Sequence, residues 1–203
     1  KDDLPVDNDA WAYVAPPRKA KVLLVTDGNF YLEKALSILP NVEATRVDAA
    51  SYVGQGGYDV VIFDDVSPER VGPGNLLYIR KAGPNAPAEV TGQVSHPGIV
   101  DWNRSHPLTR FVNFGGILLR SSESIKPAPW AQTLVETQEG PLIVAGERTG
   151  LRSIYVGFHL VEDSNFPVKV GFPVFIANCV QWLAQRPGQG EATQARTGDV
   201  VTV

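Results

Sequence analysis

A histidine and a glutamate stand three residues apart in the stretch GFHLVEDS, residues 157–164, which follows the short apolar run 153–156. A histidine that a carboxylate orients can act as the base that activates a nucleophile. His159 and Glu162 are therefore the first candidates for a catalytic pair. On an extended segment successive side chains alternate between faces, so a spacing of three aims the carboxylate differently from a spacing of two unless a turn compensates.

Further carboxylates follow predicted buried strands. Asp27 comes after the apolar run 22–25, and Asp64 and Asp65 close the run YDVVIFDD. The carboxyl ends of parallel strands meet at the edge of a sheet where ligands bind. The candidate ligand-binding residues at this edge are Asp27, Asn29, Asp64, Asp65 and Arg80.

Oxygen ligands at such an edge could hold Mg²⁺, as in phosphoryl-accepting receiver domains. Those domains carry an acidic pair after the first strand and a lysine after a later one, and this sequence matches that pattern only in part. We therefore predict no metal and no cofactor. Asp27 is expected to cap the following turn or helix.

Other reactive side chains fit structural roles. Cys179 lies in an apolar stripe, which predicts a thiol in the core. His96 and His106 each precede a proline, which predicts extended turns rather than metal ligation. The glycines at 54–57 precede a strand and do not open a helix, and no serine stands in a G-x-S-x-G elbow, so neither dinucleotide binding nor serine hydrolysis is expected.

The elements that must position these residues alternate between strands and helices. Apolar runs predict strands at residues 22–25, 42–47, 58–64 and 75–79, with a helix at 30–39 after the first. Residues 80–107 carry four prolines and three glycines and are expected to be irregular. Strands are expected within 111–125 and 140–158, the latter as a hairpin, and a last helix at 172–185. The pattern predicts an α/β fold with a doubly wound, mostly parallel sheet.

Composition narrows the class of protein. The chain has 203 residues, 43% of them hydrophobic and 20% charged, as in an ordinary globular domain. Its net charge of -4 and the lack of a basic run argue against nucleic-acid binding. No apolar stretch approaches the roughly 20 residues of a membrane helix, so this piece is not expected to insert in a membrane. It contains no methionine, and we expect it to come from a longer protein.

Several stretches resemble a known family. They are KVLLVTDGNFYLEKALSILPNVEATRVDAASY, YDVVIFDDVSPERVGPGNLLYI, HPL at 106–108, and GFHLVEDSNFPVKVGFPVFIANCVQWLA. Together they resemble the class I glutamine amidotransferase-like domain of large bacterial membrane proteins with BatA-type and von Willebrand factor A regions. The resemblance implies a flavodoxin-like three-layer sandwich at residues 18–187. It makes 1–17 the terminal strand of a preceding β-sandwich domain or an N-terminal extension, and 188–203 a linker into a following domain.

The same resemblance implies that catalysis has been lost. Active members of the family use a cysteine at an elbow after the strand that corresponds to NLLYI, and a His-x-Glu pair later in the chain. Residues 80–83 here are RKAG, without a cysteine, and Glu162 is displaced by one residue, so His159 and Glu162 are vestigial candidates.

The implied function is a non-catalytic binding or scaffolding module of a membrane-anchored protein. Its partners would be the neighbouring von Willebrand factor A and β-sandwich domains or a separate protein, with an extracytoplasmic location. The alternative is a thiol-independent hydrolase or transferase that uses His159, Glu162 and a carboxylate such as Asp64.

Overall fold

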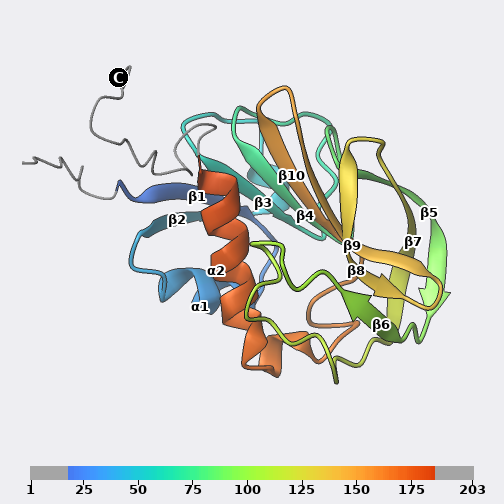
Figure 1. Ribbon diagram of the computed structural model, residues 1–203. Coiled ribbons are helices and arrows are strands. Elements are labelled where there is room, and N and C mark those ends of the chain that lie inside the picture. Colours follow the sequence, from blue (N-terminus) through green and yellow to red (C-terminus); the bar gives the residue numbers. More distant parts are fainter. Residues whose placement is uncertain (1–17, 186–203) are drawn as a thin grey trace, which may run out of the picture.

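A parallel half and an antiparallel half make up the central sheet of the computed structural model, which describes residues 18–185 (Figure 1). The strand order is β2-β1-β3-β4-β10-β9-β8-β6. The parallel strands are β1 (Ala20–Val25), β2 (Val42–Val47), β3 (Val60–Asp64), β4 (Asn75–Ile79) and β10 (Leu151–Val156). The sheet continues antiparallel through β9 (Gly140–Arg148), β8 (Ala131–Thr137) and β6 (Ile99–Trp102).

The central parallel strands form because their residues are apolar on both faces. Every residue of β3 is buried, as are residues 22–25 of β1 and 76–79 of β4. Parallel strands that are covered on both sides require such continuous apolar runs. The strands predicted at residues 22–25, 58–64 and 75–79 are therefore confirmed, and the strand predicted at 42–47 is present as the mostly exposed edge strand β2.

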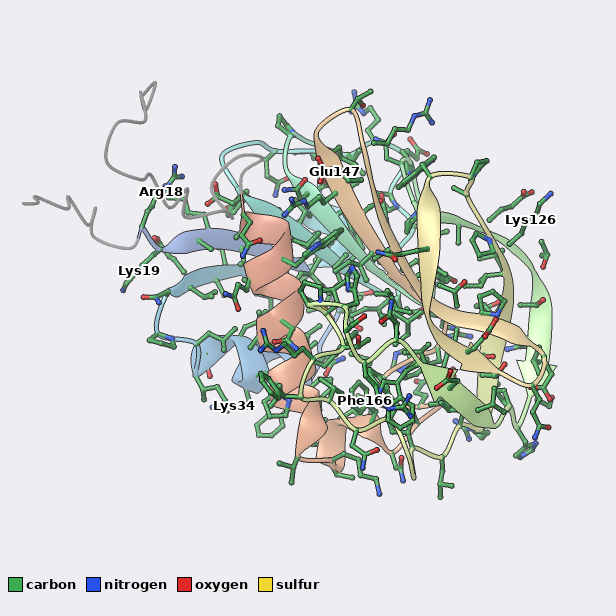
Figure 2. The ribbon with its side chains drawn as sticks, in the orientation of Figure 1. Arg18, Lys19, Lys34, Lys126, Glu147 and Phe166 are labelled. Atoms are coloured by element: carbon green, nitrogen blue, oxygen red, sulfur yellow. The ribbon has the colours of Figure 1, made fainter. Side chains whose placement is uncertain are left out.

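Two helices cover one face of this sheet. Helix α1 (Phe30–Ser37) begins at Asn29, whose side-chain oxygen accepts the backbone N–H of Leu32 at 3.1 Å. Helix α2 (Gly171–Ala184) buries a stripe that includes Phe175 and Cys179, and it packs beside α1 in the same core cluster. Phe166, in the short 3-10 helix η2 (Phe166–Val168), is fully buried against the aromatic rings of this cluster (Figure 2).

The opposite face is covered mainly by strands and turns. The 3-10 helix η1 (Ala49–Ser51) lies after β2, and a separate sheet is formed by β5 (Ala88–Ser95) and β7 (Ser121–Pro127). Ala88 and Ile125 from this small sheet join the second core cluster, together with Phe63 and Tyr78 from the central sheet. The result is the predicted α/β three-layer fold, and the order of its five parallel strands is that of flavodoxin-like folds.

The prediction was wrong for residues 80–107, which contain β5 and β6 rather than an irregular loop. Six of the eight residues of β5 are exposed, so this strand lacks the apolar signal of a core strand. Its pairing partner β7 lies far along the chain. Strand β8 was also not predicted, whereas the expected strand pattern at 111–120 is largely absent.

Two further expectations bear on particular positions. His96 was expected to be extended, but its φ of 50° places it in the left-handed region, at the turn between β5 and β6. The strand expected within residues 1–17 and the linker at 188–203 lie outside the described residues.

Candidate functional site

The candidate site lies at the point where the order of the parallel strands reverses, between β1 and β3. The chain runs from β1 outward to β2 and then returns to β3 on the other side of β1. In folds of this kind the carboxyl ends of the two strands at such a point border the ligand crevice. Thr26 follows β1 and Asp64 ends β3, so both side chains are placed at this point.

Asp64 is buried and fully engaged with polar partners. It is 5% exposed, and its Oδ2 accepts a hydrogen bond from the Thr26 hydroxyl at 2.7 Å. Its Oδ1 accepts a hydrogen bond from the side-chain amide of Asn29 at 3.3 Å. Asn29 therefore has two roles, because its amide oxygen caps α1 while its amide nitrogen holds Asp64.

Burial raises the pKa of the Asp64 carboxyl above its ordinary value. The hydrogen bonds from Thr26 and Asn29 and the electrostatic influence of the nearby His159 side chain act in the opposite direction and offset only part of this effect on the pKa. Burial disfavours the ionised carboxylate because the low-dielectric interior solvates charge poorly.

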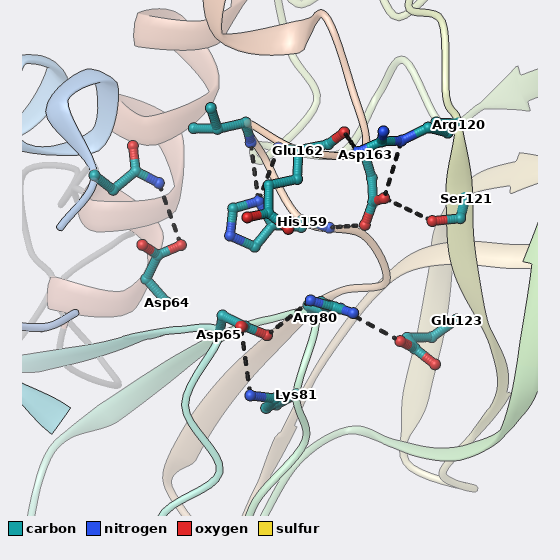
Figure 3. A network of polar contacts seen from close by, with 12 residues as sticks. Asp64, Asp65, Arg80, Lys81, Arg120, Ser121, Glu123, His159, Glu162 and Asp163 are labelled. Carbon is teal, nitrogen blue, oxygen red and sulfur yellow. Dashed lines mark hydrogen bonds and ion pairs between the residues drawn. The ribbon is translucent and has the colours of Figure 1, made fainter. Parts of the chain in front are cut away.

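His159 approaches Asp64 from the loop after β10. Its Nδ1 accepts the backbone N–H groups of Val161 at 3.2 Å and Glu162 at 2.9 Å. Because a neutral imidazole has one donor and one acceptor nitrogen, this pattern assigns the proton to Nε2. In Figure 3 the ring faces the carboxylate of Asp64, in agreement with the electrostatic influence of His159 on that group.

Glu162 contacts the histidine through its backbone and not through its carboxylate, which belongs to an exposed residue. The acidic side chain that organises this loop is Asp163, which sequence reasoning missed. Its Oδ2 accepts the backbone N–H of His159 at 3.3 Å, and its Oδ1 accepts the Ser121 hydroxyl at 2.6 Å. The Asp-Ser pair after a strand is a turn signal, but no local pattern reveals the partner on β7.

An elbow follows β4, at the position where the resemblance placed a nucleophile. Arg80 has a φ of 65° and Asp65, after β3, has a φ of 55°, both in the region that L-residues seldom adopt. The backbone N–H of Arg80 donates to the carbonyl of Val156 at 2.7 Å, and the hydroxyl of Tyr155 donates to the carbonyl of Arg80. Bonds on both sides of the residue hold this conformation.

The Arg80 guanidinium lies between two carboxylates (Figure 3). Its Nη1 is 3.5 Å from Asp65 Oδ1, and its Nε is 3.7 Å from Glu123 Oε1. Lys81 Nζ is 3.4 Å from the other oxygen of Asp65. The elbow therefore presents a partly exposed network of alternating charge in place of a nucleophile.

The predicted ligand residues fall into three positions. Asn29 and Asp64 contact each other, Asp65 pairs with Arg80, and Asp27 lies apart. The expectation that Asp27 caps the turn or helix that follows it was wrong, because Asn29 caps α1 and the Asp27 side chain instead accepts the backbone N–H of Ala49 in η1 at 3.1 Å. Within residues 18–185, no three His, Cys, Asp or Glu side chains are grouped closely enough to hold a metal ion.

Cys179 is a core thiol, as predicted. Its exposure is 0%, and burial raises the pKa of the thiol well above its ordinary value. A buried thiol is not available as a thiolate nucleophile.

The strand order and the polar residues at the carboxyl ends of β1, β3, β4 and β10 define an α/β protein with a flavodoxin-like, glutamine amidotransferase-like fold. A family described as "Domain of unknown function (DUF7408)" matches residues 21–85. No curated protein matches this chain.

Solved structures share the fold at low sequence identity. A cytoplasmic protein from Salmonella typhimurium LT2, STM1381, is 14% identical with a TM-score of 0.65, covering 81% of this chain and 100% of its own. A second one from Salmonella typhimurium, STM3548, is 12% identical with a TM-score of 0.65, covering 82% and 100%. A putative ThuA-like protein from Bacteroides uniformis is 13% identical with a TM-score of 0.55, covering 86% and 94%.

These matches correct the family resemblance drawn from the sequence. The neighbours point to a ThuA-like fold, and none of these findings links the chain to BatA-type or von Willebrand factor A proteins. Buried strands and the turns at their ends follow the same physical pattern throughout flavodoxin-like folds. The stretches that carried the resemblance therefore indicate the fold and do not identify the narrower family.

The expected location receives no support either. Two of the neighbours are named as cytoplasmic proteins, which does not favour an extracytoplasmic site. In the part of the chain that the structure describes, no helix has the length and apolar character needed to span a bilayer.

Proposed function

We propose that this domain has no glutamine amidotransferase activity and acts as a binding module, with its ligand or partner at the carboxyl edge of the parallel strands. Low-identity structural likeness establishes the fold alone, so the proposal rests on the chemistry of the site.

The observation that carries the proposal is the elbow after β4. Thiol-based acyl transfer needs a thiolate at this strained turn with a base beside it. Arg80 occupies the turn with its guanidinium between Asp65 and Glu123, and Cys179 lies buried in α2. The strained backbone is present while the nucleophile is absent, which favours recognition over covalent chemistry.

The surroundings of the elbow are suited to binding. Arg80, Lys81, Asp65 and Glu123 offer donors and acceptors on partly exposed side chains. The loops at residues 106–119 and 157–170, which meet at the bridge between Leu119 and Ser164, carry exposed apolar side chains. These include Phe111, Leu118 and Val170, which are 82%, 71% and 90% exposed. Exposed apolar side chains that gather into a patch are typical of recognition surfaces.

Glutamine hydrolysis tests the catalytic part of the proposal. We expect the purified chain to release no ammonia from glutamine above the rate in buffer. Turnover that disappears in Cys179→Ala would overturn the proposal, because it would identify a working thiol.

A thermal-shift screen of small polar compounds tests the binding part. A compound present at 100 times its Kd stabilises the folded state by about 2.7 kcal/mol. We expect a compound that raises the Tm to lose its effect in Arg80→Ala and to keep it in Arg104→Ala. Arg104 is a suitable control because it pairs with Asp101 away from the elbow. A compound that stabilises both variants equally binds elsewhere and would contradict this assignment of the site.

A second candidate function is a thiol-independent hydrolase or transferase. One observation favours it. The Nδ1 atom of His159 accepts two backbone N–H groups, and the opposite edge of the ring points toward the buried Asp64. A histidine beside a carboxyl of raised pKa can transfer protons. Hydrolysis of chromogenic esters that is lost in His159→Gln and kept in Glu162→Gln would support this alternative. Equal residual rates in both variants would exclude it.

A further inference from the structure

Strand β5 forms the outer edge of the small sheet, on the side of the molecule away from α1 and α2 (Figure 1). Among residues 18–185 it pairs with β7 alone. Most of β5 is exposed, and Val90 on it is 38% exposed. A strand with an unpaired edge is a template for pairing with another strand.

The hydrogen bonds at the ends of the β5–β7 ladder show which backbone groups face outward. His96 N–H donates to the Arg120 carbonyl at 2.9 Å, and Glu123 N–H donates away from β5 to Gly157 at 2.6 Å. Residues opposite each other in an antiparallel pair alternate between bonded and non-bonded positions. Gln93 and Ser95, opposite Glu123 and Ser121, are therefore non-bonded and direct their N–H and C=O groups to the open edge.

The same reasoning applies to the first half of β5. Ala128 N–H donates to the Pro87 carbonyl at 2.8 Å, so the next pair, Ala88 with Pro127, is non-bonded. Proline suits this place because it has no N–H to give. Val90, two residues on, also faces outward.

The bulge in β5 makes this edge self-complementary. Thr91 is the extra residue, because the register passes from Val90 to Gly92 on β5 but from Ile125 to Ser124 on β7. The residues whose backbone N–H and C=O groups face the open edge are therefore Ala88, Val90, Gln93 and Ser95. These four residues lie symmetrically about the midpoint between Thr91 and Gly92. If two copies pair antiparallel about a twofold axis at this midpoint, Val90 lies opposite Gln93 of the second copy and Ala88 lies opposite Ser95. Backbone groups that face the edge in one copy then meet backbone groups that face the edge in the other.

Charge also favours a second copy as the occupant. The single charged residue of β5 is Glu89, near its start and opposite Lys126 on β7, a side chain on the outer side of the molecule (Figure 2). Antiparallel pairing about the axis places Glu89 opposite Val94 of the second copy, far from the second Glu89. Like charges thus avoid each other.

The two edges of the main sheet are protected differently. Strand β2 carries Glu43 and Arg46 along its exposed length, and β6 is four residues long with Asp101 and a register shift. Charges, short length and bulges are the usual means by which edge strands avoid association. Strand β5 also has a bulge, but it is longer than β6, its one charged residue is Glu89 near its start, and it has no lysine or arginine.

We propose that β5 is a dimerisation strand, which pairs antiparallel with β5 of a second copy and joins two small sheets into one four-stranded sheet. This interface does not depend on the proposed function. Pairing along one strand is smaller than a standard interface, so association is reversible and increases with concentration.

Sedimentation equilibrium of the 203-residue chain over a concentration series tests the proposal. The average mass should rise with concentration toward twice the mass of the chain. Two variants should remain monomeric: Val90→Lys, which puts a charge on the edge, and Gln93→Pro, which removes an outward N–H without removing a bond to β7. Amide exchange at Gln93 and Ser95 in the wild type should slow as the concentration rises.

The matched control is Val100→Lys, which places the same charge on an exposed valine of β6 and should leave dimerisation intact. If Gln93→Pro fails to fold by circular dichroism, Val90→Lys alone decides. A monomer at every concentration overturns the proposal. So does a dimer that persists in the folded β5 variants, or one that Val100→Lys disrupts equally.

Discussion

The hydroxyl of Tyr155 is predicted to stabilise the elbow at Arg80, and Tyr155→Phe tests this directly. The ring of Tyr155 is fully buried, and its hydroxyl donates to the Arg80 carbonyl. Removing the hydroxyl leaves the packing of the ring in place, so the expected loss comes from the hydrogen bond and from the carbonyl left behind.

The size of the effect follows from these two contributions. A lost intramolecular hydrogen bond costs about 0.5–1.5 kcal/mol, and a buried acceptor left without a donor costs about 1–3 kcal/mol. Arg80 is partly exposed, so water can replace part of the lost donor. We expect the free energy of unfolding to fall by about 1–2 kcal/mol, which lowers the Tm by about 2–8 °C in a domain of this size.

Urea denaturation and calorimetry measure this change. Tyr31→Phe is the matched control, because Tyr31 is 37% exposed and its hydroxyl can meet water in the folded state. We expect the control to match the wild type within about 0.5 kcal/mol. Equal stability of Tyr155→Phe and Tyr31→Phe would refute the idea that this hydroxyl holds the elbow.

Three other predictions concern buried groups. Because burial raises the pKa of Asp64, its protonated form favours folding below the ordinary pKa of 3.8, and this stabilisation is lost as pH rises through the folded-state pKa. We therefore expect Asp64→Asn to reduce the pH dependence of stability above pH 3.8, measured by urea denaturation, and an unchanged pH profile would contradict this. Cys179 should react with a thiol reagent only as fast as the chain unfolds, and rapid labelling of the native protein would show that the thiol is accessible. Phe166→Ala should lower the free energy of unfolding by about 3–5 kcal/mol, since it empties the centre of an aromatic cluster, whereas a loss below 1 kcal/mol by calorimetry would mean that the cluster closes over the gap.

The parts of the fold that could be predicted are those whose signal is local. Burial of β3 can be predicted from its own apolar run, and burial of one face of α1 from the helical spacing of Leu32, Ala35 and Leu36. Strand β5 has no such signal, because most of its side chains are exposed and, among residues 18–185, it pairs with β7 alone. Strands with exposed side chains are therefore not predicted from the hydrophobic pattern of the sequence.

The candidate site divides in the same way. Asp64 and Arg80 could be proposed because they follow buried strands, and strand ends converge at one edge of a parallel sheet. The side chains that reach the site from other segments could not be inferred. Glu123 and Asp163 reach the site from β7 and from the loop after β10, and Glu162, which the spacing favoured, directs only its backbone N–H to His159.

The sequence by itself determined the α/β class, the central parallel strands, the positions of helices α1 and α2, and the absence of a cysteine at the elbow after β4. These properties depend on residue type and on neighbours a few positions away. Only the tertiary structure decided that Arg80 is held at a positive φ between two carboxylates, that His159 faces Asp64, and that β5 pairs with β7 alone among residues 18–185. Such features arise from contacts between segments far apart in the chain, which no local pattern of residues records.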